Sequence, residues 1–117
     1  MDRSFGEEGL PNITPADLKR RLDAGDAGQS LQLLDVREPW EFERARIEGS
    51  VLTPMSVIAE EGMPEPDGER DTVVICHHGV RSAHIVRLLG SAGFERVLNL
   101  EGGLDSYSAA DPEVPRY

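Results

Sequence analysis

The sequence predicts an α/β domain with a central parallel β-sheet and helices on both of its faces. Short apolar runs rich in branched residues alternate with segments of helical periodicity, which is typical of parallel strands joined by helical crossovers. The chain has 117 residues, of which 38% are hydrophobic and 29% charged, enough for one hydrophobic core. We therefore expect a single α/β domain.

The N-terminal part of the sequence predicts where the folded domain and its first helix begin. Residues 1–12 have no clear periodicity and are expected to be a loose, flexible lead-in to a domain over residues 13–117. Thr14 is a favourable N-cap, Pro15 fits the first helical position, and Gly25 is placed to end the helix that they begin.

The next stretch predicts two strands with a short helix between them. Residues 31–36 form an apolar run, read as a buried strand, and residues 50–53 a second short strand. Residues 38–44 favour a short helix, with Trp40 as its largest core candidate. Residues 60–71 are rich in proline, glycine and acid, which indicates a surface loop.

The second half of the chain repeats the alternation. Residues 72–75 are β-branched throughout and predict a central strand, and residues 97–100 predict another. Between them, residues 82–92 favour a helix. Its expected apolar face is Ile85, Leu88, Leu89 and Ala92. A last short helix, containing Tyr107 as a further core candidate, is expected after Gly102, followed by a tail over residues 111–117.

The charge of the chain excludes several classes of partner. The formal net charge is -10 and Lys19 is the only lysine, so we expect neither nucleic-acid nor membrane-surface binding. Residues 72–94 contain no acid but hold Arg81, Arg87 and all three histidines, which either favours a local anion site or reflects an apolar strand and a packed helix. No apolar run approaches the ~20 residues of a membrane span, and residues 1–10 do not resemble a signal peptide. We expect a cytoplasmic monomer.

The candidate chemistry lies in the segment 76–82, between a buried strand and a helix. Ligands of parallel sheets bind beyond the carboxyl ends of the strands, where Cys76 is expected. The N–H groups of the following helix and the cation of Arg81 favour a thiolate, and Gly79 permits a tight turn around it. Cys76 is the only cysteine, and consecutive Cys76, His77 and His78 diverge, so we expect neither a metal nor another cofactor.

Four segments carry a resemblance to one known family. The motif Cys-x-x-Gly-x-Arg-Ser over residues 76–82 resembles the active-site loop of the rhodanese family. The sequences Asp-Val-Arg at 35–37, Ile-Glu-Gly-Ser at 47–50 and Glu-Gly-Gly-Leu at 101–104 resemble further family motifs in the family's order. The chain departs from the family at Ala45-Arg46, where Gly-His is frequent, and at Tyr107, where tryptophan is frequent.

The resemblance implies a thiosulfate sulfurtransferase-like enzyme that works by double displacement. Cys76 would be the nucleophile that carries a persulfide, and Arg81 would orient the loop or an anionic donor. Sulfur would pass from thiosulfate or a persulfide to a thiol or cyanide acceptor. The backbone of the loop would line the substrate pocket through His77, His78, Gly79, Val80 and Ser82. Asp35 and Arg37 would be supporting residues at the end of the adjacent strand.

Other functions stay open at this point. A non-catalytic binding module of the same family, or a persulfide carrier that serves a partner in a sulfur relay, would share the fold. A cysteine-dependent phosphatase or arsenate reductase would use a similar loop, but with five residues between its cysteine and arginine; four lie between Cys76 and Arg81. The net charge opposes long-range steering of the thiosulfate dianion, which favours a protein or small-molecule persulfide as the native donor. His77 and His78 are either solvent-facing or substrate-contacting.

Overall fold

The computed structural model describes residues 4–5 and 10–117, and its centre is one sheet with the strand order β1-β2-β6-β5-β3-β4. The strands are β1 (Ser4–Phe5), β2 (Pro11–Ile13), β3 (Leu31–Asp35), β4 (Val51–Leu52), β5 (Asp71–Ile75) and β6 (Val97–Leu100). The pairs β2–β6, β6–β5, β5–β3 and β3–β4 are all parallel, and β1 pairs antiparallel with β2 at one edge. The predicted parallel sheet is confirmed.

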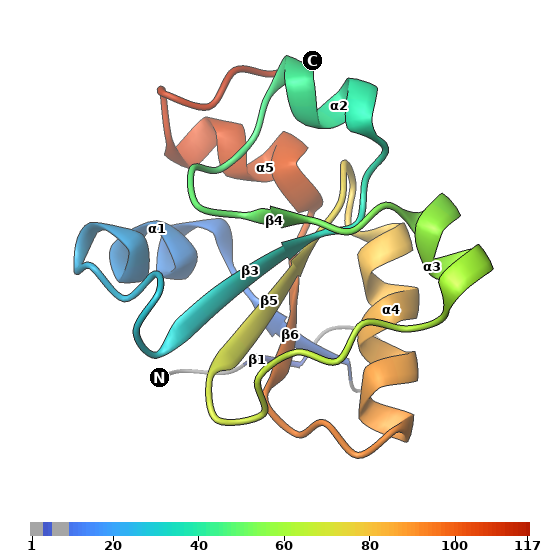
Figure 1. The fold of residues 1–117 in the computed structure, drawn as a ribbon. Helices are drawn as coiled ribbons and strands as arrows, with labels where there is room; N and C mark the ends of the chain where they lie inside the picture. Colours follow the sequence, from blue (N-terminus) through green and yellow to red (C-terminus); the bar gives the residue numbers. More distant parts are fainter. Residues whose placement is uncertain (1–3, 6–9) are drawn as a thin grey trace.

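Helices cover both faces of the sheet, as Figure 1 shows. They are α1 (Pro15–Asp23), α2 (Pro39–Arg44), α3 (Met55–Glu61), α4 (Val80–Ser91) and α5 (Gly103–Ala110). Helices α1 and α5 lie on one face, and α3 and α4 on the other. No helix among the described residues is long and apolar enough to span a membrane.

Alternation along the strands divides the core into two layers. In β5, Val73 and Ile75 pack on the side of α1 and α5, whereas Val74 packs against α3 and α4. Successive side chains of a strand point to opposite faces, so a strand buried on both faces is apolar throughout. This is why the continuous apolar run at 72–75 marks the centre of the sheet.

The start of α1 is formed as its sequence predicts. Thr14 is the N-cap, and its Oγ1 accepts a hydrogen bond of 3.2 Å from the Asp17 backbone N–H. Pro15 occupies the first turn, where its missing N–H has no helical partner to lose.

The N-terminal segment differs from the expectation of a loose lead-in. Pro11–Ile13 is strand β2, whose Asn12 pairs with Asn99 of β6, and Ser4–Phe5 is strand β1. The remainder of that predicted segment, residues 1–3 and 6–9, lies outside the described residues. The strand was missed because its partner is more than eighty residues away and its own three residues carry little pattern.

Three expectations about buried side chains are wrong: Trp40, Leu88 and Ala92 are all exposed, and Ala92 lies just past the last residue of α4. Trp40 is 58% exposed, because α2 turns Glu41 inward and a neighbouring helical residue lies about 100° away around the axis. Leu88 is also exposed, since the buried stripe of α4 runs through Ser82, Ile85, Val86 and Leu89. The predicted core position of Tyr107 is confirmed.

The predicted surface loop over residues 60–71 is shorter than expected. Its first two residues complete α3, and Asp71 is the buried first residue of β5. Asp71 forms ion pairs of 2.9 Å with Arg21 and 3.2 Å with Arg96. Burial of an acid depends on such partners from distant segments, which a local pattern does not reveal.

Candidate active site

Cys76 follows β5 directly and lies at the carboxyl edge of the sheet, where the sequence predicts it. Its side chain is buried, and its Sγ accepts hydrogen bonds from the backbone N–H groups of Gly79 at 3.0 Å and Ser82 at 3.3 Å. Gly79 is the N-cap of α4 and has φ of 92°, a left-handed conformation that glycine adopts without strain. The loop thus turns the first N–H groups of α4 onto the sulfur, an arrangement that stabilises negative charge.

A buried polar pair supports this loop from β6. Ser82 Oγ lies 3.2 Å from Cys76 Sγ and donates a hydrogen bond of 2.5 Å to Asn99 Oδ1. Asn99 Nδ2 donates in turn to the Gly79 carbonyl at 3.3 Å. Because the single hydroxyl hydrogen of Ser82 goes to Asn99, the oxygen presents a lone pair that can accept the thiol S–H. Asn99 was not among the predicted site residues, although a polar residue inside the apolar run 97–100 is a signal for it.

Helix α5 holds the opposite side of the loop. The backbone N–H of Leu104 donates to the Cys76 carbonyl at 2.8 Å, and that of Asp105 donates to the His77 carbonyl at 3.0 Å. Gly103 makes this approach possible, since a Cβ at this position would overlap with both carbonyl groups. The Gly-Gly motif therefore has a structural reason: it lets a helix N-terminus dock on the backbone of the cysteine loop.

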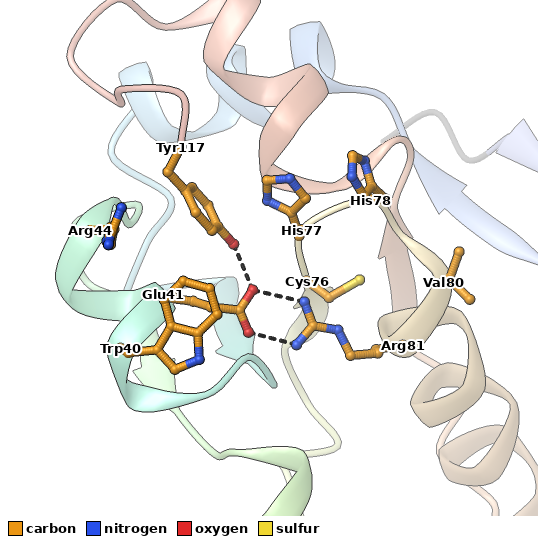
Figure 2. Close-up of a pocket in the computed structure, with 9 residues that line it drawn as sticks. All are labelled: Trp40, Glu41, Arg44, Cys76, His77, His78, Val80, Arg81 and Tyr117. Atoms are coloured by element: carbon orange, nitrogen blue, oxygen red, sulfur yellow. Dashed lines mark hydrogen bonds and ion pairs between the residues drawn. The ribbon is translucent and has the colours of Figure 1, made fainter.

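Arg81 is an ion-pair partner rather than a free cation. Its Nη1 donates to Glu41 Oε1 at 2.7 Å and its Nη2 donates to Glu41 Oε2 at 2.9 Å, so the guanidinium and the carboxylate form a bidentate ion pair (Figure 2). Hydrogen bonding from Arg81 lowers the pKa of Glu41 to about 2, and the same contact raises the pKa of Arg81. The fixed positive charge expected beside Cys76 is thus balanced by an acid from α2, which sequence reasoning missed as a site residue.

Tyr117 reaches the site from the tail after α5. Its hydroxyl donates a hydrogen bond of 2.9 Å to Glu41 Oε2, and its ring packs edge-on against His77 with 4.3 Å between ring centroids. Burial raises the pKa of Tyr117 to about 12, so the phenol stays protonated and donating at neutral pH. No local signal in the sequence connects this tail residue with the cysteine loop.

The two histidines of the loop have different surroundings. His77 is half-buried, and burial, followed by the nearby His78, lowers the pKa of its imidazole. His78 is exposed, and its Nδ1 lies 3.9 Å from Asp105 Oδ2. Both side chains line the same pocket as Cys76.

Asp35 and Arg37 form a fully buried pair at the end of β3. Arg37 donates to the Asp35 carboxylate through Nε at 2.9 Å and Nη2 at 2.7 Å. It also donates to the backbone carbonyls of Glu41 at 3.3 Å and Ala45 at 2.7 Å. Arg37 therefore anchors the backbone of α2 in its middle and at its C-cap, and this contact supports the helix that carries the Glu41 carboxylate.

A pocket of about 390 Å³ opens beside the cysteine. It is lined by Trp40, Glu41, Arg44, Cys76, His77, His78, Val80, Arg81 and Tyr117. Figure 2 shows the rings of Trp40 and Tyr117 on one side of Cys76 and Val80 on the other. Of the predicted site residues, Gly79 and Ser82 contact the sulfur, whereas Asp35 and Arg37 are buried and do not line the pocket.

Fold and site together define an α/β protein with a single cysteine. The cysteine lies in the loop between a strand and a helix, and its sulfur accepts hydrogen bonds from backbone N–H groups at the start of that helix. Residues 14–110 match the model of the family described as Rhodanese-like domain, and the chain belongs to this family. This confirms the resemblance carried by the four motifs.

Relatives in the family differ in overall size. The "Probable adenylyltransferase/sulfurtransferase MoeZ" of Mycobacterium tuberculosis is 37% identical over 107 residues, which cover 90% of this chain and 26% of the relative. The "Putative sulfur carrier protein YrkF" of Bacillus subtilis is 32% identical over 85% of this chain and 51% of its own. The chain thus spans about a quarter to a half of these relatives.

A solved structure of similar size shares the fold. The rhodanese-related protein of Thermoplasma volcanium superposes with a TM-score of 0.73 and 30% identity, covering 91% of this chain and 98% of its own. The matched relatives include proteins named sulfurtransferase and sulfur carrier.

Proposed function

We propose that this chain transfers sulfane sulfur through a persulfide on Cys76. The observation that carries the proposal is the pair of N–H groups, from Gly79 and Ser82, that converge on Cys76 Sγ. These donors stabilise the attacking thiolate and the persulfide anion that replaces it, without any further cation.

The reaction has two displacements. In the first, the Cys76 thiolate attacks the outer sulfur of a donor such as thiosulfate; the donor S–S bond breaks, and sulfite leaves with the electron pair. In the second, a thiolate or cyanide attacks the outer sulfur of the persulfide, and the Sγ–S bond breaks to restore the Cys76 thiolate. Ser82 Oγ and Asn99 hold the loop, and Arg81 with Glu41 forms one wall of the pocket.

The test follows sulfur on the protein itself. Intact mass after incubation with thiosulfate is expected to show a gain of one sulfur that a reductant removes, and thiocyanate is expected after addition of cyanide. Cys76→Ser is expected to show neither, and Ser91→Ala, an exposed hydroxyl at the far end of α4, serves as the matched control. Failure of thiosulfate and of glutathione persulfide to add sulfur would reject the proposal and favour a non-catalytic binding module.

A persulfide carrier in a sulfur relay is the second candidate. It is favoured by the relative named putative sulfur carrier protein, and by relatives in which the matched part is only a portion of a longer chain. A carrier would gain sulfur in the mass experiment but release it slowly to cyanide, whereas a free transferase would turn over with both substrates. The rate of the second step therefore separates the two.

A further inference from the structure

The exposed apolar groups around Cys76 are unusual for a site that serves only compact anions. Trp40 is 58% exposed and Val80 is 76% exposed, and both line the pocket of the cysteine together with Tyr117. Large apolar side chains gathered at one exposed hollow indicate a surface that binds an apolar group. The pocket volume of about 390 Å³ also exceeds what cyanide or a single sulfur atom would fill.

Trp40 and Tyr117 together form an aromatic wall of the pocket. The two rings meet edge-on with 6.4 Å between centroids, and the Arg44 guanidinium lies over the Trp40 ring at 5.8 Å. Tyr117 is fixed further by its hydrogen bond to Glu41 and its contact with His77. Aromatic side chains have few rotatable bonds and therefore offer contact area at little cost in conformational entropy, which suits recognition of a substrate body.

The ion pair in the pocket also favours a substrate with an apolar body over a compact anion. Arg81 is paired with Glu41 by two hydrogen bonds, so this ion pair adds no net charge next to Cys76. A compact dianion such as thiosulfate therefore finds the backbone donors of the loop but no free guanidinium from Arg81. Arg44 is a further cation of the pocket lining, and its guanidinium lies over the Trp40 ring.

We infer that Tyr117 and Trp40 form the binding wall for an organic thiol acceptor with an apolar body, and that they determine acceptor specificity. The inference rests on the proposed persulfide function of Cys76. The persulfide anion on Cys76 takes the proton that the acceptor thiol releases, the acceptor thiolate attacks the outer sulfur, and the Sγ–S bond breaks with its electron pair on Cys76. The outer sulfur and its proton leave as the acceptor persulfide, so no oxidant or reductant is needed. During attack the apolar body lies against the two rings.

The experiment separates this inference from the function on which it rests. The protein is first loaded with one sulfur from inorganic disulfide and desalted, and the load is measured by intact mass. Single-turnover loss of that sulfur is then followed with benzyl thiol and with 2-mercaptoethanol, two alkyl thiols that differ mainly in the apolar body. The measured quantity is the ratio of the second-order rate constants for benzyl thiol and 2-mercaptoethanol. We expect this ratio to be about tenfold larger for the native chain than for a small-molecule persulfide, as an apolar pocket contact allows.

Variants test the wall directly. Tyr117→Ala and Trp40→Ala are each expected to reduce that preference severalfold by raising the half-saturating concentration of benzyl thiol, while Tyr117→Phe keeps the ring and the preference. Val51→Ala, an exposed apolar residue of β4 outside the pocket, is the matched control and should retain the preference. The inference would be overturned, with the persulfide function intact, by either of two results. One is a sulfur-loaded native chain that does not prefer benzyl thiol, and the other is a pair of wall variants that keep the preference. Failure to load any sulfur would overturn it together with the persulfide function.

Discussion

The carboxylate of Glu41 holds the guanidinium of Arg81 by two hydrogen bonds of 2.7 and 2.9 Å, across the pocket that contains Cys76. The two residues come from α2 and α4, so the pair joins the cysteine loop to the helix that follows β3. It also removes the free cation that the acid-free segment of the sequence indicates beside the sulfur. Charge at this site is therefore set by a contact between distant segments.

Removal of the Glu41 charge is expected to have opposite effects on stability and on thiosulfate use. Glu41→Gln should lower the free energy of unfolding by about 1–2 kcal/mol, because charged hydrogen bonds to Arg81 are lost. It should raise kcat/KM for thiosulfate severalfold, with a steeper dependence on salt, because Arg81 becomes free to attract the dianion. Denaturant unfolding and thiocyanate formation measure the two effects. Glu43→Gln, exposed on the same helix, is the control, and equal behaviour of both variants would contradict the expectation.

The same ion pair predicts a pH dependence of stability. Arg81 lowers the pKa of Glu41 from 4.5 to about 2, so the unfolded chain binds a proton at this residue in a pH range where the folded chain does not. The stabilisation by Glu41 is thus fully present above pH 4.5 and is lost as the pH falls toward 2. The difference in unfolding free energy between the native chain and Glu41→Gln should be constant from pH 7 to pH 5 and shrink below 4.5. A difference that already changes near neutrality would point to another group.

Asp35→Asn is expected to cost about 3–5 kcal/mol of unfolding free energy, because it leaves the buried Arg37 guanidinium without its carboxylate. Arg37 also anchors the backbone of α2, so the Glu41–Arg81 pair should be displaced as well. Urea unfolding measures the loss. Asp23→Asn, whose partner Lys19 lies at the surface of α1, should change stability by no more than about 0.5 kcal/mol. Similar losses in both variants would refute the structural role of the pair.

Gly103→Ala is expected to reduce sulfur uptake by Cys76 more than tenfold, because the added Cβ would overlap with the carbonyl groups of Cys76 and His77. It also places a side chain at a φ of 65°, which contributes a separate backbone strain. Gly25→Ala isolates that strain, since φ there is 82° and no atom lies within 4 Å of the added group. Rates of mass gain and thermal unfolding of both variants distinguish the two effects. Unchanged uptake in Gly103→Ala would exclude a role for the α5 contact.

Asn99→Ala is expected to slow sulfur transfer about tenfold through its effect on Ser82 and Gly79 rather than by direct contact with substrate. Loss of a buried hydrogen-bonding partner should also lower the unfolding free energy by about 1–3 kcal/mol. A double-mutant cycle with Ser82→Ala provides the control. Since the two side chains form one network, the double variant should lose less than the sum of the single variants. Additive losses would show that Asn99 acts independently of Ser82.

Patterns among neighbouring residues in the sequence were enough to predict the central strand, the start of α1 and the position of the cysteine. Thr14 and Pro15 define the start of α1 through groups that lie within one helical turn, and the run at 72–75 marks the central strand because both of its faces are apolar. The position of Cys76 at the carboxyl end of that strand follows from the same reasoning. The motif at 76–82 then identifies the family, and the match over residues 14–110 confirms it.

Other features depend on partners that are remote in the sequence. Trp40 is the largest apolar residue of its segment, yet it is exposed because Glu41 turns inward to meet Arg81, forty residues away. Asn99 and Tyr117 reach the cysteine loop only when β6 and the tail are in place. Such contacts follow from which surfaces face each other, and no local periodicity encodes that.

The sequence by itself thus determined the α/β class, the single nucleophile candidate and the loop that surrounds it, since these depend on neighbours along the chain. The tertiary structure alone decided the charge and the shape of the pocket. It paired Arg81 with an acid, exposed Trp40 and brought Tyr117 to the rim. The physical reason is that burial and ion pairing are properties of surfaces assembled from distant segments, whereas caps, strand runs and tight turns are determined by adjacent residues.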